Sequence, residues 1–207
     1  GQGGGVKVQN GNLTITNSVI ADNLGESSAG GVSGGSSTIT LVNTTVSGNV
    51  GNGIQISGGT LNVQSSMVIN NIFGGDGGGI ANGGGTVNVI GSTVSGNRAE
   101  QGGGGISTIN GTMNVTGSNV INNTSIYGGG GGIRTNGRLN VTDSNISNNI
   151  DNSPGFGGGG IFSGAQLVTL NITRTSITGN STTGPGGGIY NEGAGLNAEF
   201  TLIMSDS

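Results

Sequence analysis

The amino-acid sequence predicts an all-β fold: a right-handed parallel β-helix of about 7–8 coils, with roughly 26 residues per coil. Glycine-rich runs return every 22 to 28 residues, each directly before a Val or Ile. The apolar residues of every copy stand two positions apart, which is the spacing of a strand and not of a helix. Stacked coils bury an apolar face that one coil cannot bury alone, and parallel crossovers favour the right-handed form.

About three short strands are expected in each coil, and the first begins where the glycine run ends. Glycine permits a positive φ and a close approach of two backbones, so the run is interpreted as a corner and not as a linker. Stacked along the molecule, these corners would form a stripe with few side chains, against which a second molecule can pack. The apolar residues that open this strand are Val6, Val32, Ile54, Ile80, Ile106, Ile133, Ile161 and Ile189.

The second strand carries two apolar columns, and the third strand carries one. A Ser or Thr stands between these two strands in every copy. The columns of the second strand are Leu13, Ile39, Leu61, Val87, Met113, Leu139, Leu170 and Phe200, then Ile15, Leu41, Val63, Val89, Val115, Val141, Ile172 and Leu202. The column of the third strand is Ile20, Val46, Val68, Val94, Val120, Ile146 and Ile177.

An asparagine follows the third strand at the same position in each copy. Its amide can donate to the Asn of the next coil, as in stacked ladders, and Asn tolerates the left-handed backbone of a sharp corner. We therefore predict a structural ladder, and a ligand site built from the same residues is the alternative. The ladder consists of Asn23, Asn49, Asn71, Asn97, Asn123, Asn149 and Asn180.

Composition limits the partners that this chain can have. With 5 basic residues and a net charge of −4, it lacks the clustered Lys and Arg that nucleic acids require. No apolar run is long enough for a membrane-spanning helix, so no membrane insertion is expected. The repeat covers residues 1–207, which predicts a single domain. No capping element is evident at either end of the repeat.

The repeat can be written G-G-[IV], followed by L-x-[IV]-x-x-[ST]-x-[IV]-x-x-N. "GGGI" occurs at 77–80, 103–106, 158–161 and 186–189, and "VSGN" at 46–49 and 94–97. These motifs resemble the GGAI and FxxN signatures of bacterial β-helix surface proteins of the polymorphic outer-membrane and autotransporter-passenger type. Val or Ile replaces the Phe of that family, and the sequence shows no translocator barrel. The resemblance implies an extracellular or cell-surface location and a role as an adhesin or a surface scaffold.

The side chains offer little for catalysis. His and Cys are absent, which removes the commonest general base, the thiol nucleophile and most transition-metal ligands. The acidic residues are scattered around the predicted coil, so we expect no catalytic residue, no metal site and no cofactor. Asp143 and Arg174 stand at equivalent positions of adjacent coils, where an exposed ion pair is predicted.

The outward side of the second strand presents Thr and Asn in a flat array. β-Branched Thr and stacked Asn suit an exposed parallel strand, but a regular array can also match ice or a crystalline polysaccharide. Glycosylation is the third interpretation, because N-x-[ST] sequons recur along the chain. The possible glycosylation sites are Asn12, Asn43, Asn114, Asn140, Asn171 and Asn180.

Most aromatic residues lie in the second half of the chain, and two of them share an outward column. Phe162 and Tyr190 stand one coil apart at equivalent positions. Exposed stacked rings favour a carbohydrate platform or a protein contact. Packing beneath the longer loops is the alternative.

Together these features predict a non-enzymatic extracellular structural protein, a surface or filament-forming β-helix that self-associates. Open strand edges of a solenoid can pair end to end with further copies, and low charge density weakens the repulsion that opposes contact. Lateral association and bound glycans are further expectations. A polysaccharide-binding or polysaccharide-cleaving β-helix is the alternative function, and ice binding is the third.

Overall fold

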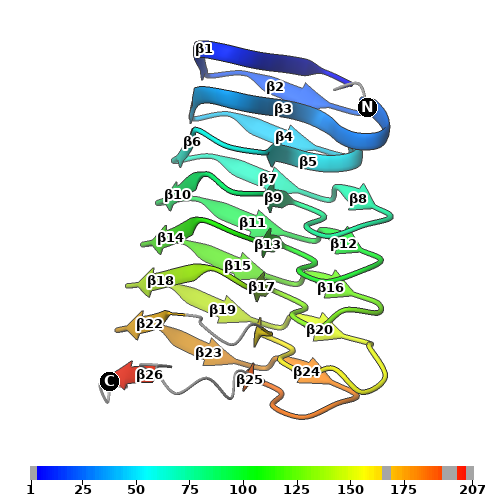
Figure 1. The fold of residues 1–207 in the computed structure, drawn as a ribbon, viewed down its shortest axis with the longest axis vertical. Coiled ribbons are helices and arrows are strands. Elements are labelled where there is room, and N and C mark those ends of the chain that lie inside the picture. Colours follow the sequence, from blue (N-terminus) through cyan, green and yellow to red (C-terminus); the bar gives the residue numbers. More distant parts are fainter. Residues whose placement is uncertain (1–3, 165–168, 193–199, 204–207) are drawn as a thin grey trace.

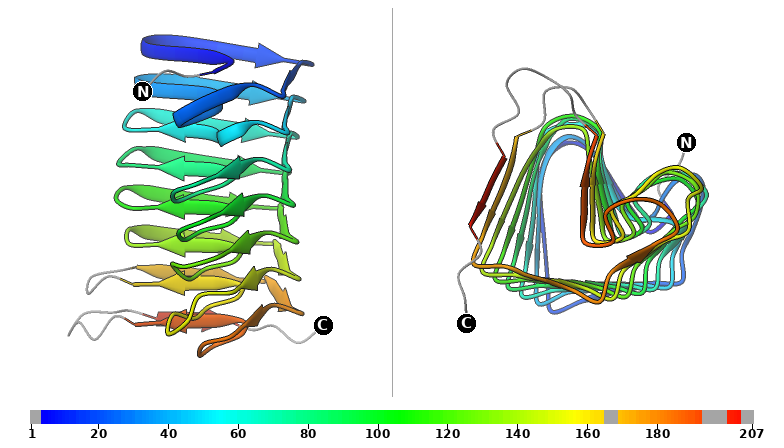
Figure 2. Two further views of the ribbon diagram at one scale, coloured as in Figure 1. Left: turned by 90° about the vertical axis from the view of Figure 1, so that its right-hand side faces the viewer. Right: turned by 90° about the horizontal axis from the view of Figure 1, so that it is seen from below.

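In the computed structural model, which describes residues 4–164, 169–192 and 200–203, the chain forms a parallel β-solenoid of about 7 turns (Figure 1). The described residues contain strands and turns but no helix. Their strands form two parallel sheets, of 19 and 7 strands. Seen along the stack, the coils superpose, and a smaller lobe curls beside the main body of each coil (Figure 2).

Residues of one predicted column pair with each other across adjacent coils of the sheets. Val6 pairs with Val32 in the first coils, and the same column continues to Ile161 opposite Ile189. The column that begins at Leu13 continues without a slip to Phe200. Because a shift of one residue would turn every apolar side chain to the opposite face, the sequence alone specifies this register.

Each coil has four stacked strand positions, one more than predicted. After the glycine run come β9 (Ile80–Asn82), β13 (Ile106–Thr108), β17 (Ile133–Thr135), β21 (Ile161–Ser163) and β25 (Ile189–Asn191). The second stack is β6 (Thr60–Gln64), β10 (Thr86–Ile90), β14 (Thr112–Thr116), β18 (Arg138–Thr142), β22 (Leu170–Thr173) and β26 (Phe200–Ile203). The third is β2 (Val19–Ala21), β4 (Thr45–Ser47), β7 (Met67–Ile69), β11 (Thr93–Ser95), β15 (Asn119–Ile121), β19 (Asn145–Ser147) and β23 (Ser176–Thr178).

The unpredicted fourth stack follows the ladder asparagine. It consists of β8 (Ile72–Phe73), β12 (Arg98–Ala99), β16 (Thr124–Ser125), β20 (Ile150–Asp151) and β24 (Ser181–Thr182). These strands are two residues long and carry mixed side chains, so they leave no apolar period in the sequence. In the first coils the stacks merge into the longer β1 (Val6–Thr16), β3 (Leu24–Val42) and β5 (Val50–Ile56).

The interior of the main body is filled by the predicted apolar columns. From Val32 to Ile161 the residues of the first column are fully buried, and so is Met113 in the second. Each such side chain contributes about 1.5–3 kcal/mol when it is removed from water. The core therefore continues from coil to coil without a break.

Besides the glycine run, two sharp corners per coil are made by residues with positive φ. One corner precedes the Ser or Thr column and includes Asn43 and Gly117, at φ 48° and 57°. The other directly precedes the ladder asparagine and includes Asn70 and Gly96, at φ 55° and 64°. The prediction that the ladder asparagines themselves take the left-handed conformation is wrong, because that conformation belongs to their predecessors, which turn the ladder side chains inward.

Each glycine of the GGGI motif has a different role. Gly103 has φ 67°. A Cβ on Gly104 would lie 2.4 Å from the Thr124 carbonyl oxygen, and one on Gly105 would lie 2.9 Å from the Asn123 Nδ2. These three residues are buried, so they do not form the expected surface stripe. They instead make room for the neighbouring backbone and for the asparagine ladder inside the coil.

Candidate functional site

The predicted asparagine ladder is present and runs in one direction. The Nδ2 of Asn71 donates to the Asn97 Oδ1 at 3.0 Å, and the backbone N–H of Asn71 donates to the same oxygen at 3.0 Å. The pattern repeats at every step from Asn23 to Asn180. Each Nδ2 from Asn49 onward also donates to a backbone carbonyl oxygen. The ladder amides are thus engaged within the fold, which supports the structural role over a ligand site.

A second ladder, of hydroxyl groups, was missed by the sequence analysis. The backbone N–H of Ser92 donates to the Ser118 Oγ at 3.1 Å, and that of Ser118 donates to the Ser144 Oγ at 3.1 Å. Each Oγ in turn donates to carbonyl oxygens, as Ser118 does to Thr116 at 2.8 Å. The column of Ser and Thr was visible in the sequence. The Asn, Asp or Gly found before several members of the column indicates a corner, where a backbone N–H needs a side-chain acceptor.

A third ladder lies on the outer face and includes three possible glycosylation sites. Asn114, Asn140 and Asn171 are half-buried, and each donates its Nδ2 to the preceding Asn Oδ1 at 2.7–2.8 Å. Asn12 and Asn43 are exposed. The Nδ2 of Asn180 donates inward to the Ile146 carbonyl oxygen at 2.8 Å. The Nδ2 of Asn43 donates to the Asn17 Oδ1 at 2.7 Å, so a glycan on Asn43 would break a surface hydrogen bond and a glycan on Asn180 would break an inner one.

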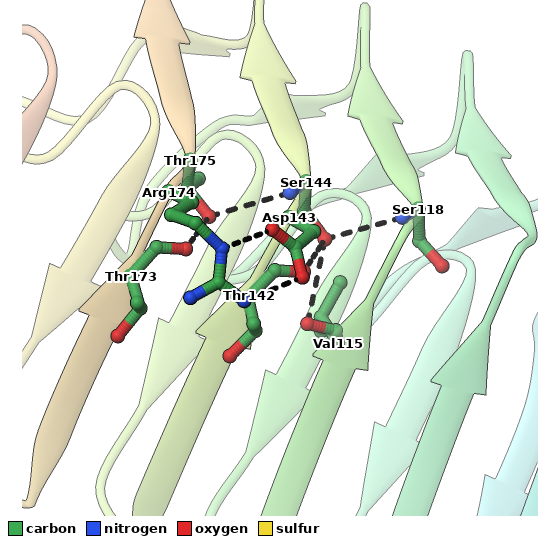
Figure 3. A network of polar contacts seen from close by, with 8 residues as sticks. All are labelled: Val115, Ser118, Thr142, Asp143, Ser144, Thr173, Arg174 and Thr175. Carbon is green, nitrogen blue, oxygen red and sulfur yellow. Dashed lines mark hydrogen bonds and ion pairs between the residues drawn. The ribbon is translucent and has the colours of Figure 1, made fainter. Parts of the chain in front are cut away.

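The predicted ion pair between Asp143 and Arg174 is present and bidentate (Figure 3). The Arg174 Nε donates to the Asp143 Oδ1 at 2.6 Å, and the Nη2 donates to Oδ2 at 2.7 Å. This hydrogen bonding lowers the pKa of Asp143 and raises that of Arg174. Both residues are exposed corner residues with positive φ, so the pair joins two corners at the surface.

A second ion pair spans two coils. The Arg134 Nη1 donates to the Asp76 Oδ1 at 2.7 Å, and the Gly102 backbone N–H donates to the same oxygen at 2.8 Å. A Cβ on Gly102 would lie 2.3 Å from the Arg134 Cδ, so glycine in the intervening coil lets the arginine pass. The sequence analysis compared equivalent positions of adjacent coils only. Arg134 and Asp76 lie 58 positions apart, about two coils, so this pair was not predicted.

Asp151, the last residue of β20, is a fully buried acid. Its Oδ1 accepts from the Ser125 Oγ at 2.7 Å and from the Ser153 backbone N–H at 3.1 Å, and its Oδ2 accepts from the Thr182 Oγ1 at 3.0 Å. These donors satisfy the hydrogen-bonding capacity of the buried carboxyl oxygens. Ser125 and Thr182 lie opposite Asp151 on the neighbouring coils, so the cluster follows from the register.

Phe162 and Tyr190 pair across adjacent coils as predicted, with ring centroids 5.9 Å apart. The expectation that both are exposed is wrong for Phe162, which is 1% exposed. Phe156 packs edge-on against it, also at 5.9 Å between centroids. Phe162 therefore fills the space beneath the glycine loops, and Tyr190 is half-buried.

A small cavity opens between β9 and the loop that follows β8. Its volume is about 220 Å³, and Ala81 of β9 lies between Gln55 and Ser107 of the neighbouring coils. Phe73 and Asp76 line it from the loop side. The Asn52 Oδ1 and the Ser107 Oγ, in side chains that also line the cavity, are buried without a hydrogen-bond partner. This cavity is the best-defined candidate binding site in the described part of the chain.

An apolar stripe lies on the outside of the early coils. Leu24, Val50 and Ile72 occupy one column on three neighbouring coils and are 61%, 53% and 48% exposed. A groove of about 400 Å³ runs beside Val50 and Ile72 and is otherwise lined by Phe73 and glycines. The sequence analysis did not single out this stripe, because its column does not stay apolar: Ile72 pairs with Arg98, and Arg98 pairs with Thr124.

Comparisons with known proteins find no matching family model, no significantly similar curated protein and no significantly similar solved structure. The autotransporter-passenger resemblance therefore stands on the motifs alone.

Among the described residues, no three acidic side chains come close enough together to hold a metal ion. The described segments also contain no helix of the length and hydropathy needed to cross a bilayer.

Proposed function

We propose that this chain is a non-enzymatic extracellular structural protein that self-associates into filaments. The observation that carries the proposal is the continuous register of the second strand stack, beside a buried ladder that runs in one direction. Strands paired in parallel present complementary groups at their two edges, so a further copy can pair in the same register. Such a contact between identical molecules is heterologous and propagates as a filament.

The stripe of Leu24, Val50 and Ile72 supports lateral contact between copies. Apolar patches of this kind mark interaction sites, and the net charge of −4 over 207 residues opposes contact only weakly. The GGGI and [VI]xxN motifs support a cell-surface setting of the polymorphic outer-membrane or autotransporter-passenger type. Glycans at the exposed Asn12 and Asn43 and a role in adhesion are part of the same proposal.

Sedimentation velocity over a range of concentrations, with electron microscopy of the same samples, tests this proposal. We expect species that grow with concentration and appear as rods joined end to end. Ile72→Lys should reduce side-by-side bundling and leave the rods joined, whereas Thr116→Lys, on the exposed outer face, serves as the matched control. A chain that remains monomeric at the highest concentration would refute the filament.

A further inference from the structure

We propose that the cavity at Ala81 binds one ring of a neutral sugar. This site lies in the groove between the first strand stack and the glycine loops. It is distinct from the apolar stripe of the filament proposal, although Phe73 lines both the cavity and the groove beside the stripe. Asn52 and Gln55 come from β5, Ala81 from β9 and Ser107 from β13, so three consecutive coils build it.

The size of the ligand follows from the repeat. The outward column that contains Ala81 continues through Ser107 and Arg134 to Phe162. In the Phe162 coil an aromatic ring fills the groove and is 1% exposed. At Ala81 the same groove holds only a methyl group, and about 220 Å³ remains. This volume is far above the roughly 10–15 Å³ that a single water needs, so the space accommodates one six-membered ring.

The chemistry of the ligand follows from the lining. The Nδ2 of Asn52 donates to the Asp76 carbonyl oxygen at 2.8 Å, whereas the Oδ1 of Asn52 has no donor. The Ser107 Oγ also lacks a partner, although Ser107 is 1% exposed. Buried polar groups in native proteins nearly always have a partner. Both side chains are covered in the empty cavity, so a polyhydroxy ligand supplies the missing donor and acceptor when these side chains turn toward it.

Charge and surface type narrow the class further. The carboxylate of Asp76 is paired with Arg134 at 2.7 Å, so the site has no uncompensated charge to attract an ionic ligand. Phe73 and Ile109 add apolar surface to the lining. A sugar ring has both hydroxyl groups and an apolar face of C–H bonds, and aromatic side chains pack well against such a face. A neutral sugar satisfies all of these features together.

The equivalent positions in other coils supply variants that the fold already accepts. Ala81→Phe introduces into the cavity the phenylalanine that the same column has at position 162. Ser107→Ala introduces the alanine that the column has at position 81. Ser33→Ala changes the same column outside the cavity and serves as the control. Circular dichroism and the unfolding midpoint verify that each variant retains the fold.

Saturation-transfer NMR with glucose, galactose, mannose and N-acetylglucosamine measures binding to the full chain, with galacturonate and phenol as comparison probes. We expect millimolar binding of at least one neutral sugar, loss of that signal in Ala81→Phe, about tenfold weaker binding in Ser107→Ala, and no change in Ser33→Ala. The proposal is overturned if no neutral sugar gives a signal that Ala81→Phe removes, or if galacturonate or phenol binds more tightly. Neither outcome affects the filament proposal, whose measurement is sedimentation.

Discussion

At the scale of single residues, the corners explain why polar side chains are buried inside the coil. At the two corners before the Ser or Thr column and before the ladder asparagine, the backbone N–H that follows the positive-φ residue donates to a side chain of the following coil. The acceptor is the Asn97 Oδ1 for Asn71 and the Ser118 Oγ for Ser92. A buried N–H without an acceptor is costly. The inward Asn and Ser therefore complete the hydrogen bonding of the backbone where the strand ladder is interrupted.

Replacing one inner ladder residue is expected to destabilise the protein strongly. Asn97→Leu removes the oxygen that accepts both the backbone N–H and the Nδ2 of Asn71, so two buried donors lose their partner. We expect a loss of about 3 kcal/mol in the free energy of unfolding, measured by urea denaturation. Asn88→Thr in the half-buried outer ladder copies Thr40 and should cost less than about 1 kcal/mol. Equal effects of the two substitutions would contradict this role of the inner ladder.

The Asp143–Arg174 pair is expected to give a small pH dependence. Since the Arg174 guanidinium lowers the pKa of Asp143, the pair stabilises the fold above the pKa of the unfolded carboxyl, about 3.9. That contribution is lost as the pH falls through the lower folded pKa. The melting temperature of wild type should exceed that of Arg174→Gln at pH 7, and the two should converge in acid and in high salt.

The exposed Arg138 provides the control for this pH dependence. Arg138→Gln also removes a positive charge from the surface but breaks no bidentate pair with Asp143. Its melting temperature should follow that of wild type at every pH. A difference between wild type and Arg174→Gln that persists at pH 2 would show that the effect comes from the corner backbone and not from the carboxylate.

At the scale of elements, the glycine run is a corner in which each position has its own requirement. Gly103 supplies the positive φ, Gly104 lies against the backbone of the next coil, and Gly105 lies against the side chain of Asn123. The sequence showed that the run returns to one place in every coil. It did not show that the last glycine and the ladder asparagine are packed together, because that contact joins residues of different strand stacks.

A single methyl group at the last glycine is expected to disturb both elements. In Gly105→Ala the new Cβ would lie 2.7 Å from the Gly132 carbonyl oxygen and 2.9 Å from the Asn123 Nδ2. Overpacking of this kind costs about 2 kcal/mol, which thermal unfolding monitored by circular dichroism would measure. Gly117→Asn is the matched control, since nothing lies within 4 Å of a Cβ there and Asn43 has the same corner conformation. If Gly117→Asn lowers the melting temperature as much as Gly105→Ala does, the contact with the ladder is not the cause.

At the scale of the whole molecule, the coils form a continuous body in which each layer repeats the contacts of the one before (Figure 1). In such solenoids stability is approximately a sum over neighbouring layers. The two proposed contact sites are departures from the repeat: the exposed Leu24, Val50 and Ile72 stripe, and the cavity at Ala81. The cavity arises where Ala81 stands between Gln55 and Ser107. The stripe arises because its column is apolar in three neighbouring coils and becomes Arg98 and Thr124 in the next two.

The sequence by itself determined the fold class, the register and the asparagine ladder, because apolar residues and asparagines recur at the same position in every coil and a parallel stack aligns them. The same logic located the Asp143–Arg174 pair. Only the tertiary structure decided the burial of Phe162, the Asp76–Arg134 pair and the cavity at Ala81. These depend on how the glycine loops fold over the outward face of the first strand stack. The loops carry no apolar period, so their path over that face is set by contacts between side chains distant in the sequence.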